Sequence, residues 1–195
     1  MTNAVRRLGP GALFTVVGPS GAGKDTLIHW LRHRDETRHV LFVRRIVTRD
    51  ADPEHEDHDT ASVEAFEAAR ASGRYAVTWG AHGLNYGVPT TALDHVRRGG
   101  IAVVNGSRKA LGEMRAVFPN VIVVHVDVSP DVRAARLRQR GRETQAEIES
   151  RLDRAVAPPD TTDAVHIDNS GPIEVAGQRV LDLIAAASER PGVAP

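Results

Sequence analysis

Gly18-Pro19-Ser20-Gly21-Ala22-Gly23-Lys24 is the stretch of sequence that predicts the fold most directly. It follows an apolar segment, Ala12–Val17, that predicts a strand, and it leads into a predicted helix, Lys24–Arg34. The pattern G-x-x-x-x-G-K between a strand and a helix is typical of a nucleotide phosphate loop, whose backbone N–H groups converge on phosphate oxygens. The helix N-terminus adds positive partial charge, and the lysine ammonium reaches the β- and γ-phosphates. The alternative is a glycine-rich turn that binds nothing. The predicted nucleotide-binding residues of this loop are Gly18, Pro19, Ser20, Gly21, Ala22, Gly23, Lys24, Asp25 and Thr26.

Asp25 departs from the usual pattern, because a phosphate loop has Ser or Thr at this position to ligate Mg²⁺. Mg²⁺ prefers oxygen ligands, often carboxylates, so Asp25 is expected to bind Mg²⁺ directly or through water. The alternative is an acid that only complements the helix dipole. A carboxylate beside a triphosphate would be repelled without a metal, which favours the metal role.

Composition excludes several classes of protein. A chain of 195 residues predicts one domain, and its 25 basic residues cancel 25 acidic ones, so no net field indicates nucleic acid or an anionic membrane as a partner. The absence of cysteine excludes disulfides and thiolate chemistry. No apolar run approaches the ~20 residues that span a bilayer, and residues 1–10 lack the apolar region of a secretory signal. We therefore expect a cytoplasmic protein. Its oligomeric state is not indicated.

Lysine is rare in this chain: among the 25 basic residues only Lys24 and Lys109 are lysines. An arginine-biased chain that keeps a lysine is expected to need a compact ammonium group at that position.

Apolar segments alternate with helical patterns along the chain. This alternation predicts right-handed βαβ crossovers and a parallel sheet flanked by helices, that is, an α/β P-loop NTPase fold. The strands read as continuous apolar runs, which is typical of a sheet covered on both faces. Strands are predicted at 12–17, 40–47, 75–79, 101–104, 121–128 and 164–167, and helices at 24–34, 65–71, 91–98, 109–117, 130–140, 144–155 and 173–187. An acidic loop is predicted at 50–59.

With these motifs the chain resembles the guanylate-kinase branch of the P-loop kinases over about residues 13–184. Val47-Thr48-Arg49 resembles the start of that family's acceptor-phosphate motif, and residues 82–89 resemble its G-N-Y-Y-G turn. Residues 136–144, followed by Ile148 and Arg151-Leu152, resemble its lid. The resemblance implies one domain over 1–195, with an acceptor-binding insertion at about 48–92, a lid at about 133–150 and a tail at 191–195.

The departures from that family concern the recognition of guanine. The glutamate that follows Trp-Ala is absent, since Trp79 is followed by Gly80-Ala81, and the acid at the end of the next apolar strand is replaced by Asn105-Gly106-Ser107-Arg108. The second acceptor-binding arginine and the tyrosine of the acidic loop are also absent. What remains resembles the ribose 1,5-bisphosphate phosphokinase family in G-P-S-G-A-G-K-D, Thr48-Arg49, Glu56-x-His58, His82-Gly83 and Asn105-Gly-Ser-Arg108. The glycine pair that this family has before Glu56 is missing.

This second resemblance implies a reaction. The chain would use ATP and Mg²⁺ to convert ribose 1,5-bisphosphate, a small phosphosugar, into 5-phospho-α-D-ribose 1-diphosphate (PRPP) and ADP, in phosphonate catabolism. The alternatives are a divergent guanylate kinase acting on GMP and a non-catalytic guanylate-kinase-like interaction module. A phosphate acceptor is already ionised and needs no general base, whereas a sugar hydroxyl would need one, and Asp25 is better explained as a metal ligand.

The catalytic residues are expected to be basic, because phosphoryl transfer needs charge neutralisation more than covalent help. Arginines recur over 133–142, where positions 133, 136 and 140 share one helix face. A solvated charged face is the alternative to a catalytic lid. The predicted catalytic residues are Lys24, Arg136, Arg140 and Arg151.

The acceptor is expected to bind at the carboxyl edge of the predicted strand 40–47, where Arg45 and Arg49 can form bidentate contacts with phosphate while Arg44 faces outward. Glu56 and His58 would accept hydrogen bonds from ribose hydroxyls, although a solvated acidic loop remains an alternative. A zinc site at His55 and His58 is a further alternative, but no third ligand is evident for it. The predicted acceptor-binding residues are Arg45, Arg49, Glu56, His58, His82, Tyr86, Asn105, Ser107 and Arg108.

Three further residues are assigned by their position in the sequence. Trp79 and His125 are expected in the core. Asn169, which follows the last short strand, is expected to contact adenine, as the resemblance implies.

Overall fold

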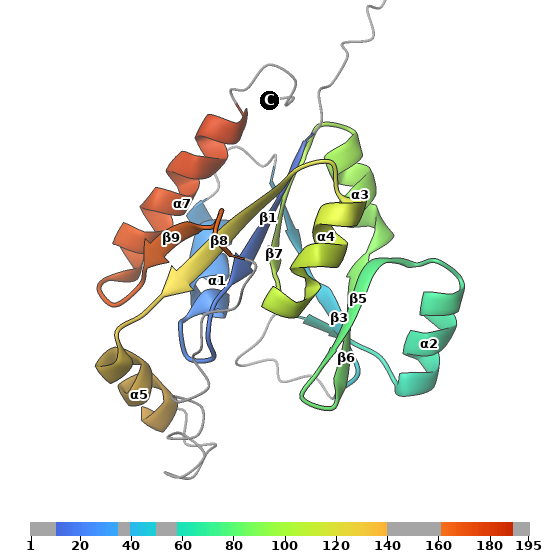
Figure 1. The fold of residues 1–195 in the computed structure, drawn as a ribbon, viewed down its shortest axis with the longest axis horizontal. Coiled ribbons are helices and arrows are strands. Elements are labelled where there is room, and N and C mark those ends of the chain that lie inside the picture. Colours follow the sequence, from blue (N-terminus) through green and yellow to red (C-terminus); the bar gives the residue numbers. More distant parts are fainter. Residues whose placement is uncertain (1–10, 35–39, 50–57, 140–160, 189–195) are drawn as a thin grey trace, which may run out of the picture.

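The computed structural model describes residues 11–34, 40–49, 58–139 and 161–188. Its main sheet has five strands, all parallel, in the order β2-β7-β1-β8-β9 (Figure 1). The strands are β1 (Ala12–Val17), β2 (Val40–Val43), β7 (Ile101–Asn105), β8 (Val121–Asp127) and β9 (Val165–Asp168). β1 is the central strand and is hydrogen-bonded to β7 on one side and β8 on the other. The loop at its carboxyl end therefore starts from a strand that is held on both sides. The α/β fold with a parallel sheet flanked by helices is confirmed.

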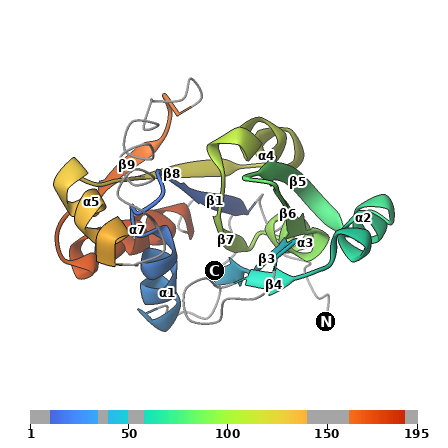
Figure 2. The ribbon, with the colours of Figure 1, turned by 90° about the horizontal axis from the view of Figure 1, so that it is seen from below.

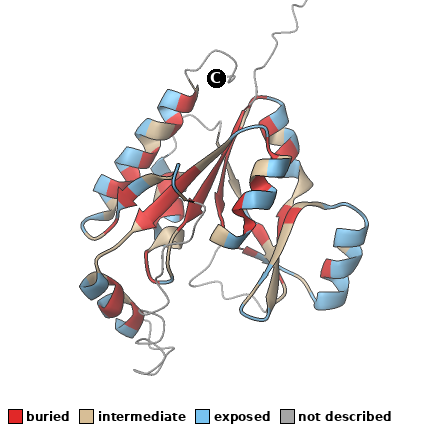
Figure 3. Ribbon diagram, in the orientation of Figure 1, coloured by how far each residue is buried: buried red, intermediate tan, exposed pale blue. Residues whose placement is uncertain are grey.

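Helices cover both faces of this sheet (Figure 1). The helices α1 (Lys24–Arg34) and α7 (Ile173–Ser188) bury one face, and α3 (Thr90–Arg97) and α4 (Leu111–Val117) bury the other. Alternation along β1 supplies both cores: Phe14 faces α1 and α7, whereas Leu13 faces α3 and α4, and both are fully buried. Burial therefore extends along the whole of β1 (Figure 3).

The contact between α1 and α7 depends on a small residue. A Cβ atom at Gly177 would lie 2.3 Å from the ring of Trp30, so only glycine allows the two helices to approach this closely. Within the described ranges no helix is long and apolar enough to cross a bilayer.

A second sheet lies beside the first, in the order β4-β3-β6-β5. Its strands are β3 (Arg45–Val47), β4 (His58–Thr60), β5 (Tyr75–Ala81) and β6 (Leu84–Pro89). The helix α2 (Val63–Ala71) begins after Ser62, whose hydroxyl accepts a hydrogen bond from the Ala65 N–H at 3.1 Å, and it packs Phe66 on Tyr75. Figures 1 and 2 show this sheet with α2 on one side of the loop between β1 and α1, and α5 (Pro130–Gln139) on the other side.

The predicted single strand at 40–47 is wrong, because the chain breaks at Arg44 into β2 and β3, which belong to different sheets. Arg44 is exposed, as expected, and donates to the Asp59 carboxylate at 2.8 Å and to the His58 carbonyl at 3.1 Å. These contacts hold the chain where it passes from one sheet to the other.

The strands β4 and β6 were not predicted. β6 pairs with β5 through a turn at His82-Gly83, where both residues have positive φ, 54° and 74°. Two adjacent left-handed residues make a type I′ turn, which matches the twist of a hairpin. Residues 82–89, which resemble a family turn, therefore form a tight turn and a strand.

Smaller differences concern the helix ends. The predicted helix at 109–117 begins as a 3₁₀ turn, η1 (Arg108–Ala110), before α4. α5 covers the start of the predicted lid, and the predicted helix at 144–155 lies outside the described residues.

His125 lies on the buried strand β8, as expected, with 9% of its surface exposed. Its Nδ1 atom lies 3.0 Å from the Asp127 carboxylate. Burial lowers the pKa of His125 below its ordinary value, and the Asp127 carboxylate opposes that shift.

Candidate active site

The glycine-rich loop connects β1 to α1 in a conformation that side chains would obstruct. Gly18 and Gly23 both have positive φ, 146° and 87°. A Cβ atom at Gly18 would lie 2.5 Å from the Val126 carbonyl, and one at Gly23 would lie 2.6 Å from the side-chain nitrogen of Asn169. The loop therefore packs its backbone tightly against β8 and the residue after β9, as a cradle of N–H groups for phosphate requires.

Lys24 closes the loop. Its ammonium nitrogen donates to the carbonyls of Gly18 and Pro19, both at 3.1 Å. These contacts hold the positive charge across the loop, where phosphate oxygens would lie.

Asp25 and Asn105 face each other from neighbouring elements. Asp25 is in the first turn of α1 and Asn105 is at the carboxyl end of β7, and the Asn105 amide nitrogen donates to the Asp25 carboxylate at 2.5 Å. Asn105 is 9% exposed, and its side-chain oxygen has no hydrogen-bond partner within the described part of the chain. A carboxylate and a buried amide oxygen without a partner, beside a phosphate loop, fit a magnesium ion.

Two cavities meet at the glycine-rich loop. The first, of about 420 Å³, lies toward α5 and α7 and is lined by Gly21, Gly23, Thr26, Arg136, Gln139, Asn169 and Ile173. The second, of about 600 Å³, lies toward the second sheet and includes Lys24, Asp25 and Asn105 in its wall. Gly21 and Gly23 line both cavities. One ligand in each cavity would therefore meet the other at this loop.

Arginines of α5 hold the loop from the side of the first cavity. Arg133, only 6% exposed, donates through Nε to the Ser20 carbonyl at 2.8 Å. Arg136 donates to the carbonyls of Ala22 and Asn169, at 3.3 and 2.9 Å. Arg136, a predicted catalytic residue, thus lies beside the loop on the side of the first cavity. Arg140 and Arg151 lie outside the described residues.

Asn169 braces the same part of the loop. It is 1% exposed, and its side-chain amide donates to the Ala22 carbonyl at 2.7 Å. Asn169 also lines the first cavity. Its contact with adenine stays a prediction.

Most predicted acceptor residues that the structure describes line the second cavity. They come from β3, from the β5–β6 hairpin and from the end of β7. They are Arg45, His82, Tyr86, Asn105, Ser107 and Arg108.

Arg49 and His58 are not among the described residues that line it. Arg49 follows the end of β3 and His58 begins β4, and their side chains meet with 3.5 Å between Arg49 Nε and His58 Nε2. Glu56 and His55 lie outside the described residues, so the sugar contact of Glu56 and the alternative of a zinc site at His55 and His58 stay predictions.

An aromatic and cationic wall closes one side of the second cavity. Trp79 stacks on Tyr86 with ring centres 5.3 Å apart and planes 6° apart, and the Arg45 guanidinium lies 5.5 Å from the centre of the Tyr86 ring. Trp79 packs against the core, as expected, but it also lines the cavity. The stack fixes the two rings and orients the buried Arg45.

Two residues of the site were missed as site residues. Lys109 lines the second cavity with Lys24, so both lysines of the chain lie there. The sequence feature that distinguishes Lys109 is the rarity of lysine in this chain. Arg133 holds the loop through the Ser20 carbonyl. The sequence feature that could have identified it is its position on the same helix face as Arg136.

Replacing Gly23 by alanine is expected to weaken nucleotide binding at least tenfold and to destabilise the fold by about 1–3 kcal/mol, because the new Cβ meets Asn169 at a left-handed φ. Isothermal titration with a non-hydrolysable nucleotide and thermal unfolding would measure both effects. The matched control is Gly112→Ala, at a helical position with open space around it, where stability should be unchanged or higher by about 0.5–1 kcal/mol. Equal behaviour of the two variants would contradict the described packing of the loop.

A phosphate loop on the central strand of a parallel sheet, with one cavity on each side, defines a P-loop kinase with a guanylate-kinase-like fold. The chain matches the AAA domain family over residues 15–156, and it belongs to that broad family. A crystal structure of guanylate kinase from Anaplasma phagocytophilum superimposes with a TM-score of 0.67, covering 96% of this chain and 90% of that one, at 17% identity. At that identity the likeness supports the fold alone.

Closer relatives decide the family. The chain is 40% identical to ribose 1,5-bisphosphate phosphokinase PhnN of Agrobacterium fabrum over 183 residues, which cover 92% of this chain and 100% of that protein. It is 44% identical to the protein of the same name from Pseudofrankia inefficax over 186 residues, which cover 95% and 96% of the two chains. The chain belongs to the ribose 1,5-bisphosphate phosphokinase family, and it is an enzyme of the kinase class.

Proposed function

We propose that this enzyme transfers the γ-phosphoryl group of ATP to the C1 phosphate of ribose 1,5-bisphosphate, giving 5-phospho-α-D-ribose 1-diphosphate and ADP. The observation that carries the proposal is the pair of cavities that share Gly21 and Gly23 at the loop. A non-bridging oxygen of the C1 phosphate attacks the γ-phosphorus, and the bond between the γ-phosphorus and the β–γ bridging oxygen breaks. The names of the relatives support this acceptor.

The first cavity would take the nucleoside of ATP, with the phosphates crossing the loop toward Lys24. Asp25 and the Asn105 oxygen would hold Mg²⁺, which when bound neutralises charge on the phosphates. The Lys24 ammonium stabilises the negative charge that develops as the phosphoryl group moves. Arg133 and Arg136 keep the loop carbonyls turned outward from the cradle.

The second cavity is suited to an acceptor with two phosphates. Its wall carries the cations of Lys24, Arg45, Arg108 and Lys109, while Asp25 is the one carboxylate among the described residues that line it. A guanine base would need an acid to accept its N–H groups, and Asp25, the carboxylate among the described residues of this wall, accepts from Asn105. This charge pattern favours ribose 1,5-bisphosphate over GMP.

The chemistry of the acceptor also fits the residues present. A phosphate monoester has its second pKa near about 6 and is largely ionised at neutral pH, so no side chain has to remove a proton. The described wall is rich in cations that can neutralise the acceptor phosphates. The phosphoryl transfer therefore depends on positioning and on charge neutralisation.

An acceptor panel tests the proposal. The purified enzyme with ATP and Mg²⁺ would be given ribose 1,5-bisphosphate, ribose 5-phosphate, GMP and gluconate in parallel, and kcat/KM would be measured from ADP release and confirmed by product chromatography. We expect ribose 1,5-bisphosphate to exceed each other acceptor by at least about 100-fold. GMP turnover at a comparable rate would identify a divergent guanylate kinase. No transfer to any acceptor, with nucleotide still bound, would favour the interaction module.

Lys109→Ala is expected to raise the KM for ribose 1,5-bisphosphate about tenfold and to change kcat less than about threefold, because an exposed ammonium group would bind the acceptor without contacting the transferred group. The measurement is steady-state kinetics at saturating ATP. The control, Arg97→Ala, removes an exposed cation of α3 far from this wall and should change neither constant. A KM for Lys109→Ala equal to that of the control would remove Lys109 from the acceptor site.

A further inference from the structure

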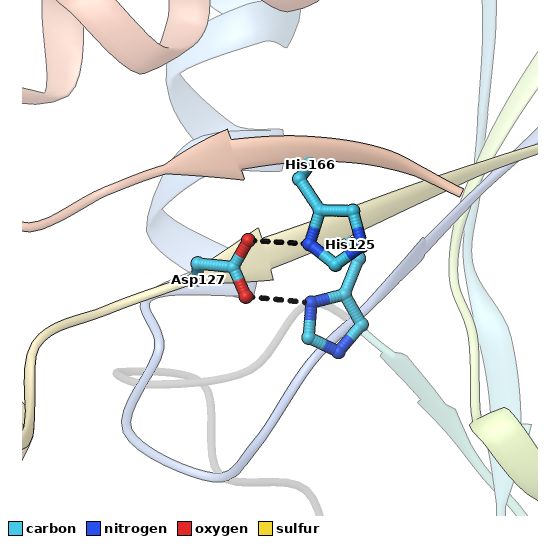
Figure 4. Close-up of side chains that lie close together, drawn as sticks. All are labelled: His125, Asp127 and His166. Atoms are coloured by element: carbon cyan, nitrogen blue, oxygen red, sulfur yellow. Dashed lines mark hydrogen bonds and ion pairs between the residues drawn. The ribbon is translucent and has the colours of Figure 1, made fainter. Parts of the chain in front are cut away.

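Two histidines and an aspartate converge at the carboxyl ends of β8 and β9, and none of the three is among the described residues that line either cavity. His125 and Asp127 are two residues apart on β8, so their side chains share one face of the sheet. His166 on β9 lies directly beside His125 in the parallel register. Figure 4 shows both imidazole rings turned toward the one carboxylate.

The contacts within this cluster are short and symmetrical. Nδ1 of His125 lies 3.0 Å from one oxygen of Asp127, and Nδ1 of His166 lies 2.7 Å from the other oxygen. The ring centres are 5.0 Å apart, and one potential ligand atom from each residue lies within 4.8 Å of the other two.

The two distances between the imidazole nitrogens and the carboxylate oxygens are close to the distances between ligand atoms around a bound metal ion. Ligands at about 2.0–2.2 Å from a tetrahedral zinc ion lie roughly 3.3 Å from one another. The two N···O distances would open by a few tenths of an ångström, and the two rings would move closer together. Asp127 and His166 can make this adjustment, because their side chains are 42% and 58% exposed, while His125 is held at 11%. With one oxygen of Asp127 bound, the three protein ligands would leave a fourth position for water.

The donor set selects the kind of metal. Two imidazole nitrogens and one carboxylate oxygen suit Zn²⁺ and its first-row neighbours, whereas Mg²⁺ prefers oxygen ligands alone. The cluster is also separate from the magnesium position, which lies between α1 and β7. Val124 and Val126, which alternate with these residues on β8, face the core under α1 and α7, so the cluster lies on the opposite face of the sheet.

We propose that His125, Asp127 and His166 form a second metal site, for a divalent transition metal such as Zn²⁺, that is independent of the catalytic magnesium. The ion would join β8 to β9 at their carboxyl ends. The Asp127 carbonyl accepts a hydrogen bond from the Asn169 N–H at 2.8 Å, and the Asn169 side chain holds the loop carbonyl of Ala22 at 2.7 Å. A metal at this site would therefore stabilise the part of the fold that supports the phosphate loop.

The test is direct zinc binding to the full chain. The protein would be stripped with EDTA, dialysed into buffer without Mg²⁺ and titrated with Zn²⁺ by calorimetry, and Co²⁺ would be used as a spectroscopic probe. We expect one equivalent to bind with Kd below about 1 μM, a visible Co²⁺ absorption band typical of a site with fewer than six ligands, and a higher Tm with Zn²⁺. His166→Gln should weaken binding at least about 100-fold and abolish the Tm increase. Asp127→Asn, which keeps the shape of the side chain, should do the same in part.

The control variant tests whether Zn²⁺ binds to a different pair of histidines. His29 and His33 are exposed one turn apart on α1, with ring centres 4.2 Å apart, and they could bind Zn²⁺ as a pair. His33→Gln should leave the binding unchanged. Loss of binding in His33→Gln, full retention in His166→Gln, or no binding tighter than about 100 μM in the unmodified chain would overturn the proposal. Because His166 is exposed, we expect His166→Gln to fold, and far-ultraviolet circular dichroism would check this.

Discussion

Replacing Lys24 by alanine is expected to lower kcat for phosphoryl transfer by roughly 10²–10³-fold while the fold stays intact, because the variant removes the ammonium group that the carbonyls of Gly18 and Pro19 hold at the loop. The two carbonyls that the ammonium contacts belong to Gly18 and Pro19, which are both partly exposed, so we expect water to replace the ammonium there in the variant. The loss should appear mainly in kcat, since the charge on the transferring group develops in the transition state. Steady-state kinetics with both substrates saturating would measure it.

Lys109→Ala is the matched control for this experiment, because Lys109 is the only other lysine and lines the same cavity. It should change KM with little change in kcat. An unchanged Tm and circular dichroism spectrum would show that Lys24→Ala folds. A kcat for Lys24→Ala within tenfold of the original enzyme would contradict the assignment of the phosphate loop.

Asp25 is expected to give the second largest effect. Asp25→Ala should lower kcat roughly 10²-fold at saturating ATP, because a carboxylate that holds Mg²⁺ near the phosphates is lost. Asp25→Ser restores an oxygen at the position where other phosphate loops have a hydroxyl, so it should keep substantial activity that depends on Mg²⁺. The measurement is the rate of both variants as a function of Mg²⁺ concentration.

The two variants separate a metal ligand from a helix-dipole effect. An acid that only complements the dipole is worth about 0.3–1 kcal/mol of stability, and its loss would leave the rate nearly unchanged. Equal rates for Asp25→Ala and Asp25→Ser, at every Mg²⁺ concentration, would count against the metal role. Thermal unfolding of each variant gives the stability term separately.

The central sheet could be predicted from the sequence because its signals are local. Continuous apolar runs such as Ile101–Asn105 are buried on both faces, and the glycine pattern after Val17 requires a tight turn before a helix. The second sheet could be predicted only in part. The break at Arg44 depends on Asp59, which is 15 positions away, and the β5–β6 turn depends on a histidine with positive φ. Neither condition is visible in a periodic pattern.

The residues of the active site likewise include some that the sequence identifies and others that only the fold brings together. The residues of the phosphate loop are contiguous, so their motif identifies them together. Arg133 and Asn169 reach that loop from positions more than 100 residues away, and only the packing of α5 and β9 on the loop makes them neighbours. The stack of Trp79 on Tyr86 likewise depends on the register of the hairpin, in which the two residues are paired.

Recognition of the acceptor followed from what the sequence lacks. The missing guanine-binding acids indicate a phosphosugar acceptor, and the cations around the second cavity support that interpretation. His166 could not be grouped with His125 from the sequence, because only the register of β8 and β9 makes the two residues neighbours.

The most direct measurement is ³¹P NMR of the product formed from ribose 1,5-bisphosphate, ATP and Mg²⁺. Transfer between phosphates predicts that the C1 monoester signal disappears and that two mutually coupled diphosphate signals replace it, while the C5 monoester signal remains. A new uncoupled monoester signal beside the two original ones would place the phosphoryl group on a ring hydroxyl and would contradict the account.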